Sequence, residues 1–116
     1  KPPLLVVSAD AGQLEQVFTN LFINAADAMH QHGEITVSIK QDVDNINIRI
    51  SDTGNGIPAE SLDKIFEPFF TTKDKGTGLG LAIVYNIVKK HHGDITVTSE
   101  EGKGTTFILT LPARHA

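Results

Sequence analysis

Four stretches of this chain alternate apolar and polar residues, and this period of two constrains the fold more than any other feature of the sequence. Such alternation predicts strands that are buried on one face and solvated on the other, as in a largely antiparallel sheet. Residues 41–44 form a link of hairpin length and residues 101–104 form a turn, so we expect two hairpins. A weaker fifth strand is expected over residues 4–8. The apolar residues that define the four stronger strands are Ile35, Val37 and Ile39; Ile46, Ile48 and Ile50; Ile95 and Val97; and Phe107, Leu109 and Leu111.

Two further segments carry apolar residues at helical spacing. The first begins after Asp10, a favourable N-cap residue, and extends to about Met29. The second extends from Gly80 to His91, and Gly93 is expected to end it. The residues expected on the buried faces are Leu14, Val17, Phe18, Leu21, Phe22, Ala25 and Ala28 in the first helix, and Leu81, Ile83, Val84, Ile87 and Val88 in the second.

The order of these elements predicts an α+β fold. We expect a two-layer α/β sandwich, in which both helices cover one face of a mixed, mostly antiparallel sheet. About thirty residues between Ser51 and Gly80 hold no strong element beyond a short helical turn over residues 61–66, which is long for an idle connection. We therefore expect the function to depend on this segment.

Composition excludes several classes of protein. A chain of 116 residues with 40% apolar residues is long enough for one core, so residues 1–116 are predicted to be a single domain. The net charge of −4 argues against a nucleic-acid surface, and the absence of cysteine excludes disulfides and thiolate metal sites. No apolar run is long enough to span a bilayer and no signal peptide opens the chain, so we expect a cytoplasmic domain without direct membrane contact.

A stripe of polar residues follows the side of the first helix opposite its apolar face. It consists of Gln16, Asn20, Asn24 and Asp27. The stripe fits a solvated surface, but asparagine is a poor residue within a helix. Two asparagine amide oxygens one turn apart also suit a hard cation that keeps water and phosphate oxygens as its other ligands.

A glycine-containing motif, Asp52-Thr-Gly54-Asn-Gly56-Ile57-Pro58, directly follows a predicted strand. It fits a simple turn, and it matches a relaxed dinucleotide-binding fingerprint only weakly, because the proline interrupts the helix that the fingerprint requires. A carboxylate at this strand end has a further use, since Asp52 is able to accept a hydrogen bond from the amino group of adenine and would repel the oxygen of guanine.

A second glycine motif, Gly76-Thr-Gly78-Leu-Gly80, opens the second helix. It fits either a flexible loop or a phosphate site, in which backbone amides and the helix dipole face the anion. Lys73 and Lys75 lie just before this motif in the sequence. They either contact phosphates or are solvated side chains. Three phenylalanines between the two glycine motifs either fill the core or anchor a mobile lid, and they are Phe66, Phe69 and Phe70. The histidines at 30, 32, 91 and 92 have no partners at metal spacing and are expected on the surface.

These motifs, in this order, resemble the catalytic and ATP-binding domain of bacterial two-component sensor histidine kinases, which belongs to the ATPase superfamily of DNA gyrase, Hsp90 and MutL. Residues 16–29 resemble the N box, 52–58 the G1 box, 66–73 the F box and 76–83 the G2 box, and 104–107 resemble the closing glycine-threonine strand. The resemblance covers nearly the whole chain and implies a Bergerat sandwich that binds ATP between its helices and a lid.

The resemblance also implies roles for particular residues. Asn24 would bind Mg²⁺, with Asn20 beside it near the phosphates, and Asp52 would bind the adenine amino group with Thr105 nearby. Asp27 departs from the basic residue that is frequent in the family at that position, and Lys73 or Lys75 is the expected substitute. With these, the residues expected to contact nucleotide are Gly54, Gly56, Ile57, Phe69, Thr71, Thr72, Gly76, Thr77, Gly78, Leu79, Gly80 and Leu81.

One position indicates the phosphoryl acceptor. Gyrase-like ATPases, and relatives that phosphorylate protein hydroxyls, carry a glutamate as general base four residues before the metal asparagine, where this chain has Asn20. An amide cannot take up a proton at neutral pH, so the resemblance favours a histidine acceptor, with Asn20, Asn24 and Lys73 as the catalytic residues. The alternatives are a gyrase-like ATPase or serine kinase and a pseudo-kinase that only binds nucleotide.

The acceptor histidine is expected on a separate dimerisation domain that is not in this chain, and a response regulator is expected downstream. By itself the domain is therefore expected to bind ATP, ADP and Mg²⁺ and to be nearly inactive. A mobile segment is expected over residues 71–76.

Overall fold

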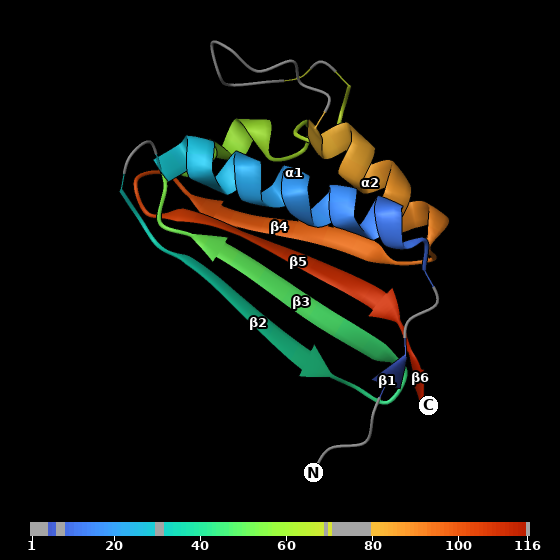
Figure 1. The fold of residues 1–116 in the computed structure, drawn as a ribbon. Coiled ribbons are helices and arrows are strands. Elements are labelled where there is room, and N and C mark those ends of the chain that lie inside the picture. The colour runs from blue at the N-terminus through green and yellow to red at the C-terminus, as the bar shows by residue number, and fades with distance from the viewer. Residues whose placement is uncertain (1–4, 7–8, 30–31, 69, 71–79, 116) are drawn as a thin grey trace.

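The computed structural model describes residues 5–6, 9–29, 32–68, 70 and 80–115. Two helices lie side by side on one face of a four-stranded sheet (Figure 1), which confirms the predicted α/β sandwich. The elements in chain order are β1 (Leu5–Val6), α1 (Ala11–Met29), β2 (Ile35–Gln41), β3 (Asn45–Asp52), the 3-10 helix η1 (Ala59–Ser61), α2 (Gly80–Lys90), β4 (Asp94–Glu100), β5 (Gly104–Pro112) and β6 (Arg114–His115).

The four-stranded sheet has the strand order β2-β3-β5-β4. Both predicted hairpins, β2–β3 and β4–β5, are present, and β3 joins them by pairing with β5. The sheet was expected to be mixed and to include the first strand, but every pairing among the described strands is antiparallel. The first strand is not part of the four-stranded sheet, because β1 pairs with β6 in a separate two-stranded sheet.

The core lies between the two helices and the inner face of the sheet, because α1 packs on β3 and α2 packs on β4. Alternate residues of β3 and β5 point into it, as the period of two predicts. The core cluster consists of Val17, Leu21, Ile48, Ile50, Ile65, Val84, Ile87, Val88, Ile95, Phe107, Leu109 and Leu111.

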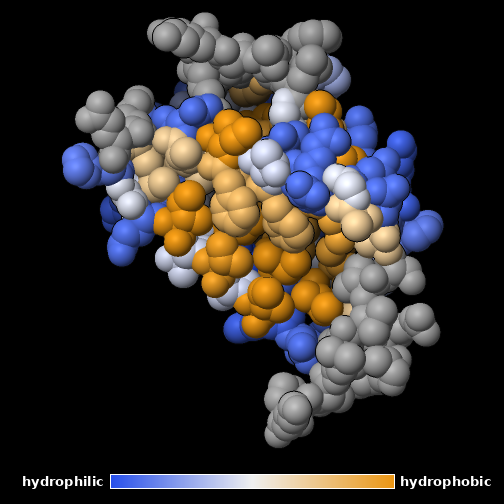
Figure 2. Space-filling model, in the orientation of Figure 1, coloured by the Kyte–Doolittle hydropathy of each residue, from blue (hydrophilic) through white to orange (hydrophobic). Residues whose placement is uncertain are grey.

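The inner face of β2 is not covered. Ile35, Val37 and Ile39 were predicted to be buried but are 37%, 48% and 63% exposed. They lie at the edge of the sheet, beyond the two helices, and Figure 2 shows an apolar surface below α1 in the region where Figure 1 draws β2. Phe22 of α1, also expected inside, is 38% exposed.

The predicted start of α1 is confirmed, since Oδ1 of Asp10 accepts a hydrogen bond from the amide N–H of Gln13 at 2.9 Å. The end of α2 differs from the prediction by one position. The left-handed residue is His92, with φ 61°, and its N–H donates to Lys89 O while that of Gly93 donates to Val88 O. This is a Schellman motif with a histidine at the position usually taken by glycine. Gly93 follows it, where a Cβ would lie 2.5 Å from the carbonyl oxygen of Thr110.

His91 was expected on the surface, but it is half-buried between the two helices. Its Nε2 accepts the amide N–H of Asp10 at 3.0 Å, and its Nδ1 donates to the carbonyl oxygen of Ile87 at 2.9 Å. The imidazole therefore joins the start of α1 to the last turn of α2. His32 is exposed as expected, and His30 lies outside the described residues.

The connection between β3 and α2 begins its helical turn earlier than expected, at Ala59 rather than Ser61, because Pro58 accepts the first hydrogen bond, from the amide of Ser61. Further turns follow to residue 68. Phe66 packs against the core, with its ring centroid 5.5 Å from that of Tyr85 and 6.3 Å from that of Phe107. Among the described residues, neither helix has the length and apolarity needed to cross a membrane.

Candidate functional site

Three polar side chains form a row across one end of the sheet. Asp52 of β3 pairs with Thr105 of β5, and Thr105 pairs with Ser99 of β4. All three side chains occupy the next inward-facing position after the apolar inward-facing residues of their strands. In β3, for example, Asp52 follows Ile48 and Ile50. Strand register, which links residues far apart in the chain, therefore brings a carboxylate and two hydroxyls together.

Two members of this row are withdrawn from water. Asp52 is 7% exposed and Thr105 is 4% exposed, and within the described part of the chain they are the buried polar side chains. Burying a carboxylate is costly unless it accepts hydrogen bonds. Oδ1 of Asp52 accepts the amide N–H of Gly54 at 2.8 Å.

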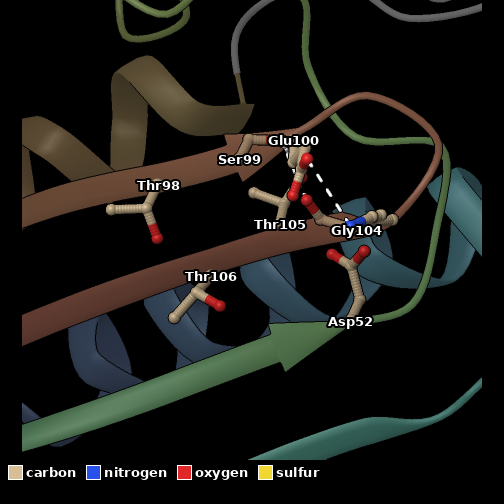
Figure 3. Close-up of a pocket in the computed structure, with 8 residues that line it drawn as sticks. Asp52, Thr98, Ser99, Glu100, Gly104, Thr105 and Thr106 are labelled. Atoms are coloured by element: carbon tan, nitrogen blue, oxygen red, sulfur yellow. Dashed lines mark hydrogen bonds and ion pairs between the residues drawn. The ribbon is translucent and has the colours of Figure 1, made fainter.

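An open pocket of about 390 Å³ lies at this end of the sheet (Figure 3). Its lining includes Asp52, Ser99 and Thr105 from the inner face and residues from the opposite face of the β4–β5 hairpin, so the pocket extends around the end of the sheet. The full lining is Asp52, Thr98, Ser99, Glu100, Lys103, Gly104, Thr105 and Thr106.

The turn after Asp52 is held from two sides, and this explains its glycines. Gly54 is buried, and a Cβ there would lie 2.7 Å from the carbonyl oxygen of Ala28, near the end of α1. Gly56 has φ +77°, and a Cβ there would contact the carbonyl oxygen of Glu100 in the β4–β5 hairpin. Packing alone therefore requires both glycines, in addition to any part they take in binding a ligand.

The same turn is bonded to the hairpin. The amide N–H of Ile57 donates to Oγ of Ser99 at 2.7 Å, and that of Gly102 donates to the carbonyl oxygen of Asn55 at 2.8 Å. The structure thus brings the predicted residues Asp52, Gly54, Gly56, Ile57 and Thr105 to one place.

Asn20, in the polar stripe of α1, contacts the start of α2. Nδ2 of Asn20 donates to the carbonyl oxygen of Gly80 at 3.2 Å. Because only the amide nitrogen is able to donate to a carbonyl, the oxygen of Asn20 is the atom that remains for a cation or another donor. Asn24, one turn further along, is half-buried, while Gln16 and Asp27 are exposed.

At the start of α2, Gly80 is exposed and no atom lies within 4 Å of a Cβ built on it, so packing does not require glycine there. Leu81 is half-buried against the core. The other predicted contacts of this region, and the expected mobile segment over residues 71–76, lie outside the described residues: Phe69, Thr71, Thr72, Lys73, Gly76, Thr77, Gly78 and Leu79.

Ser99 was not among the predicted site residues, although the sequence holds a signal for it. Ile95 and Val97 establish which phase of β4 faces inward, and Ser99 is the next residue in that phase. A polar residue that continues an apolar inward series at a strand end is the same signal that identified Asp52 after Ile50.

The described residues thus form a two-layer sandwich with a buried carboxylate and a glycine-containing turn at one end of its sheet. A family model described as histidine kinase-, DNA gyrase B- and HSP90-like ATPase matches residues 9–115, and this chain belongs to that family.

Its curated relatives include sensor kinases and a sporulation kinase. The chain is 52% identical over 106 residues to the sensor histidine kinase ZraS of Escherichia coli (strain K12), covering 91% of this chain and 23% of that protein. It is 49% identical to the sensor kinase CckA of Brucella abortus (strain 2308), covering 91% and 13%, and 46% identical to sporulation kinase E of Bacillus subtilis (strain 168), covering 98% and 15%. The chain thus spans less than a quarter of the length of these relatives and is a domain of the histidine kinase type.

Solved structures agree with this assignment. The mycobacterial sensor histidine kinase MprB superposes with a TM-score of 0.87 at 33% identity, over 98% of this chain and 79% of that one. Full-length ShkA in complex with AMPPNP superposes with a TM-score of 0.86 at 32% identity, over 98% of this chain and 24% of that one.

Proposed function

We propose that residues 1–116 form a single catalytic domain that binds Mg-ATP at the end of the sheet and transfers its γ-phosphoryl group to a histidine on a separate dimerisation domain. The observation that carries the proposal is the carboxylate of Asp52, which is 7% exposed and lies beside the hydroxyl of Thr105, with one oxygen bonded to the amide of Gly54. Such a carboxylate is poised to accept a further hydrogen bond from a ligand.

Adenine is the ligand base that suits this arrangement. Its amino group donates, whereas guanine carries a carbonyl oxygen at the same ring position, which the carboxylate repels. ShkA, which has the same fold, was solved in complex with the nucleotide analogue AMPPNP, and this supports the proposal that an adenine nucleotide binds here.

The phosphate end is proposed at the contact between the two helices. Asn20 and Asn24 offer neutral amide oxygens, which suit Mg²⁺ because this cation keeps several waters and phosphate oxygens instead of taking an all-protein cage. In keeping with this, the described residues hold no group of three or more His, Cys, Asp or Glu placed to bind a metal. Bound Mg²⁺ would neutralise phosphate charge, and Asn24 is the proposed ligand.

The remaining proposed contacts come from the residues between β3 and α2. The start of α2 at Gly80, with Gly76 and Gly78 before it, would present backbone amides and the positive end of the helix dipole to the phosphates. Lys73 would add a positive charge, in place of the basic residue that Asp27 replaces.

The reaction needs no base from this domain. An imidazole nitrogen of the acceptor attacks the γ-phosphorus with its lone pair, which forms a nitrogen–phosphorus bond and breaks the bond to the oxygen bridging to the β-phosphate. ADP leaves with that electron pair, and the other imidazole N–H gives its proton to a base on the acceptor domain. Asn20, which cannot accept a proton, is consistent with this route and disfavours attack by water or serine.

The partners follow from the relatives. Because the chain spans between 13% and 23% of the length of the three kinases compared above, a dimerisation and phosphoacceptor domain of the same parent protein is the proposed partner. A response regulator would receive the phosphoryl group from that domain, and the whole exchange would take place in the cytoplasm.

Two measurements test the proposal. Calorimetric titration with ADP, ATP and GTP, with and without Mg²⁺, should show adenine-selective binding. Incubation with ATP labelled at the γ-phosphorus should leave the domain alone unlabelled and its ATP nearly unhydrolysed. Adding the helical domain of the parent kinase should then give an acid-labile, base-stable label on that domain. Rapid hydrolysis by the isolated domain would instead indicate an ATPase, and binding without transfer would indicate a pseudo-kinase.

A further inference from the structure

Ser99 is the centre of a hydrogen-bond cluster that joins three segments of the site. Its Oγ lies 2.7 Å from the amide nitrogen of Ile57, 3.0 Å from the carbonyl oxygen of Gly104 and 2.9 Å from Oγ1 of Thr105. Figure 3 shows Ser99 and Thr105 on neighbouring strands, with Asp52 on the third strand beside Gly104.

The direction of each of these hydrogen bonds follows from the chemistry of the groups. A serine hydroxyl has one proton to donate and two lone pairs to accept. The amide of Ile57 has to donate, so it uses one lone pair of Ser99. The carbonyl of Gly104 has to accept, so it takes the single proton of Ser99. The contact with Thr105 is then made by the proton of Thr105, which occupies the second lone pair of Ser99.

The hydroxyl of Thr105 is therefore committed in one direction. Its proton points to Ser99, and only its lone pairs remain for the pocket. Asp52, on the other side, is a carboxylate and also offers only acceptors. The two buried polar side chains of the site thus present acceptors and no donor to a ligand.

We propose that Ser99 is a positioning residue that sets base selectivity by holding the Thr105 hydroxyl as an acceptor. The inference rests on the proposed nucleotide site and goes further, because it assigns the selectivity to a residue that acts through the hydroxyl of Thr105. The amino group of a base in the pocket is able to donate to Asp52 and to Thr105, either directly or through a water molecule. A base with a carbonyl oxygen there finds no donor.

Removal of Ser99 should free the Thr105 proton. In Ser99→Ala the hydroxyl of Thr105 is able to rotate and donate to a carbonyl oxygen, so a keto base becomes better tolerated. The amide of Ile57 also loses its acceptor, which lowers affinity for every nucleotide to a similar extent. Selectivity, rather than affinity, is therefore the readout that separates positioning from a structural role.

The test compares ADP with inosine diphosphate, whose base carries a carbonyl oxygen in place of the amino group of adenine. Calorimetric titration gives Kd for both ligands with the wild-type domain, Ser99→Ala and Ser99→Thr. The control is Thr110→Ala, which removes the 2.8 Å hydrogen bond from the Thr110 hydroxyl to Oδ1 of Asn47 between β5 and β3, at residues that do not line the pocket. The ratio of Kd for inosine diphosphate to Kd for ADP should fall about tenfold in Ser99→Ala, the size of one hydrogen bond. It should stay at the wild-type value in Thr110→Ala and in Ser99→Thr, which keeps the hydroxyl.

The outcomes are distinct. A wild-type ratio in Ser99→Ala, with or without a loss of affinity, would overturn the inference and leave the proposed function standing. A wild-type domain that binds neither nucleotide would overturn the proposed function. If urea titration shows that Ser99→Ala does not fold, Ser99→Cys supplies the same comparison, because a thiol donates and accepts only weakly; an unchanged ratio in that variant would equally refute the positioning role.

Discussion

Replacement of Asp52 by asparagine changes one atom of the buried carboxylate and inverts its hydrogen bonding toward the pocket. In the wild-type domain one oxygen accepts the amide of Gly54 at 2.8 Å, and the other is left to accept from a ligand. In Asp52→Asn the amide oxygen has to take over the bond to Gly54, because the NH₂ group cannot accept. The NH₂ group then occupies the position of the second oxygen and faces the donating amino group of adenine.

The magnitude follows from these two changes. A hydrogen bond to a charged group contributes about 1.5–3 kcal/mol, and a buried donor that is left facing another donor costs about 1–3 kcal/mol more. Since the two effects overlap, we expect ADP binding to weaken by about 2–4 kcal/mol, which raises Kd roughly 30- to 700-fold. The substitution keeps the shape of the side chain, so the unliganded domain should change in stability by no more than about 1 kcal/mol.

The assay is calorimetric titration with ADP at constant salt, together with urea unfolding of each variant. Asp63→Asn is the matched control, because it makes the same chemical change at an exposed position in the connection between β3 and α2 and should leave Kd unchanged. A cooperatively folding Asp52→Asn domain that binds ADP within threefold of the wild-type Kd would show that this carboxylate does not contact the nucleotide, and the reasoning from burial would be wrong.

Three further predictions concern stability and are checked by urea unfolding. Because His92 has φ 61°, His92→Gly should raise the free energy of unfolding by about 0.5–1 kcal/mol, whereas His92→Ala, which keeps the Cβ, should give no such gain. Ile39→Ala should cost less than about 1 kcal/mol and Ile50→Ala about 2–5 kcal/mol, since these residues are 63% and 2% exposed, and equal losses would contradict the placement of β2 outside the core. The hydrogen bond from Lys89 to Asp94, 2.9 Å long, lowers the pKa of that carboxyl below its unfolded-state value, so its small stabilisation is present above the unfolded pKa and is lost as pH falls through the folded pKa. Asp94→Asn should therefore be slightly less stable than wild type at about pH 6 and indistinguishable from it at about pH 2, and a difference that grows toward acid pH would refute this assignment.

Most of the fold could be predicted because its signals are local. The cap at Asp10 and the period of two in the strands depend on residues within a few positions of one another, and both are as predicted. The errors concern burial and tertiary pairing. The alternation of β2 was correct in phase, but Ile39 is exposed because its strand lies at the sheet edge, beyond the helices.

The same division applies to the site. Asp52 and the glycines around it stand out in the sequence because a carboxylate and two glycines follow a strand. The residues that surround them do not stand out in the sequence. Ser99 is more than forty positions further along the chain and contacts Ile57 only through the β4–β5 hairpin. His91 likewise has no local partner that would reveal its bond to Asp10, which lies across the pair of helices.

The sequence by itself determined the fold class, the order of the elements and the position of a carboxylate and two glycines directly after a strand, because periodicity, capping and motif composition are properties of short stretches. Only the tertiary structure decided which polar residues share the buried end of the sheet and in which direction their hydrogen bonds run. Strand register sets those neighbours: it places Asp52, Thr105 and Ser99 in one row, and a hydroxyl acquires a fixed donor direction only when its neighbours are in place.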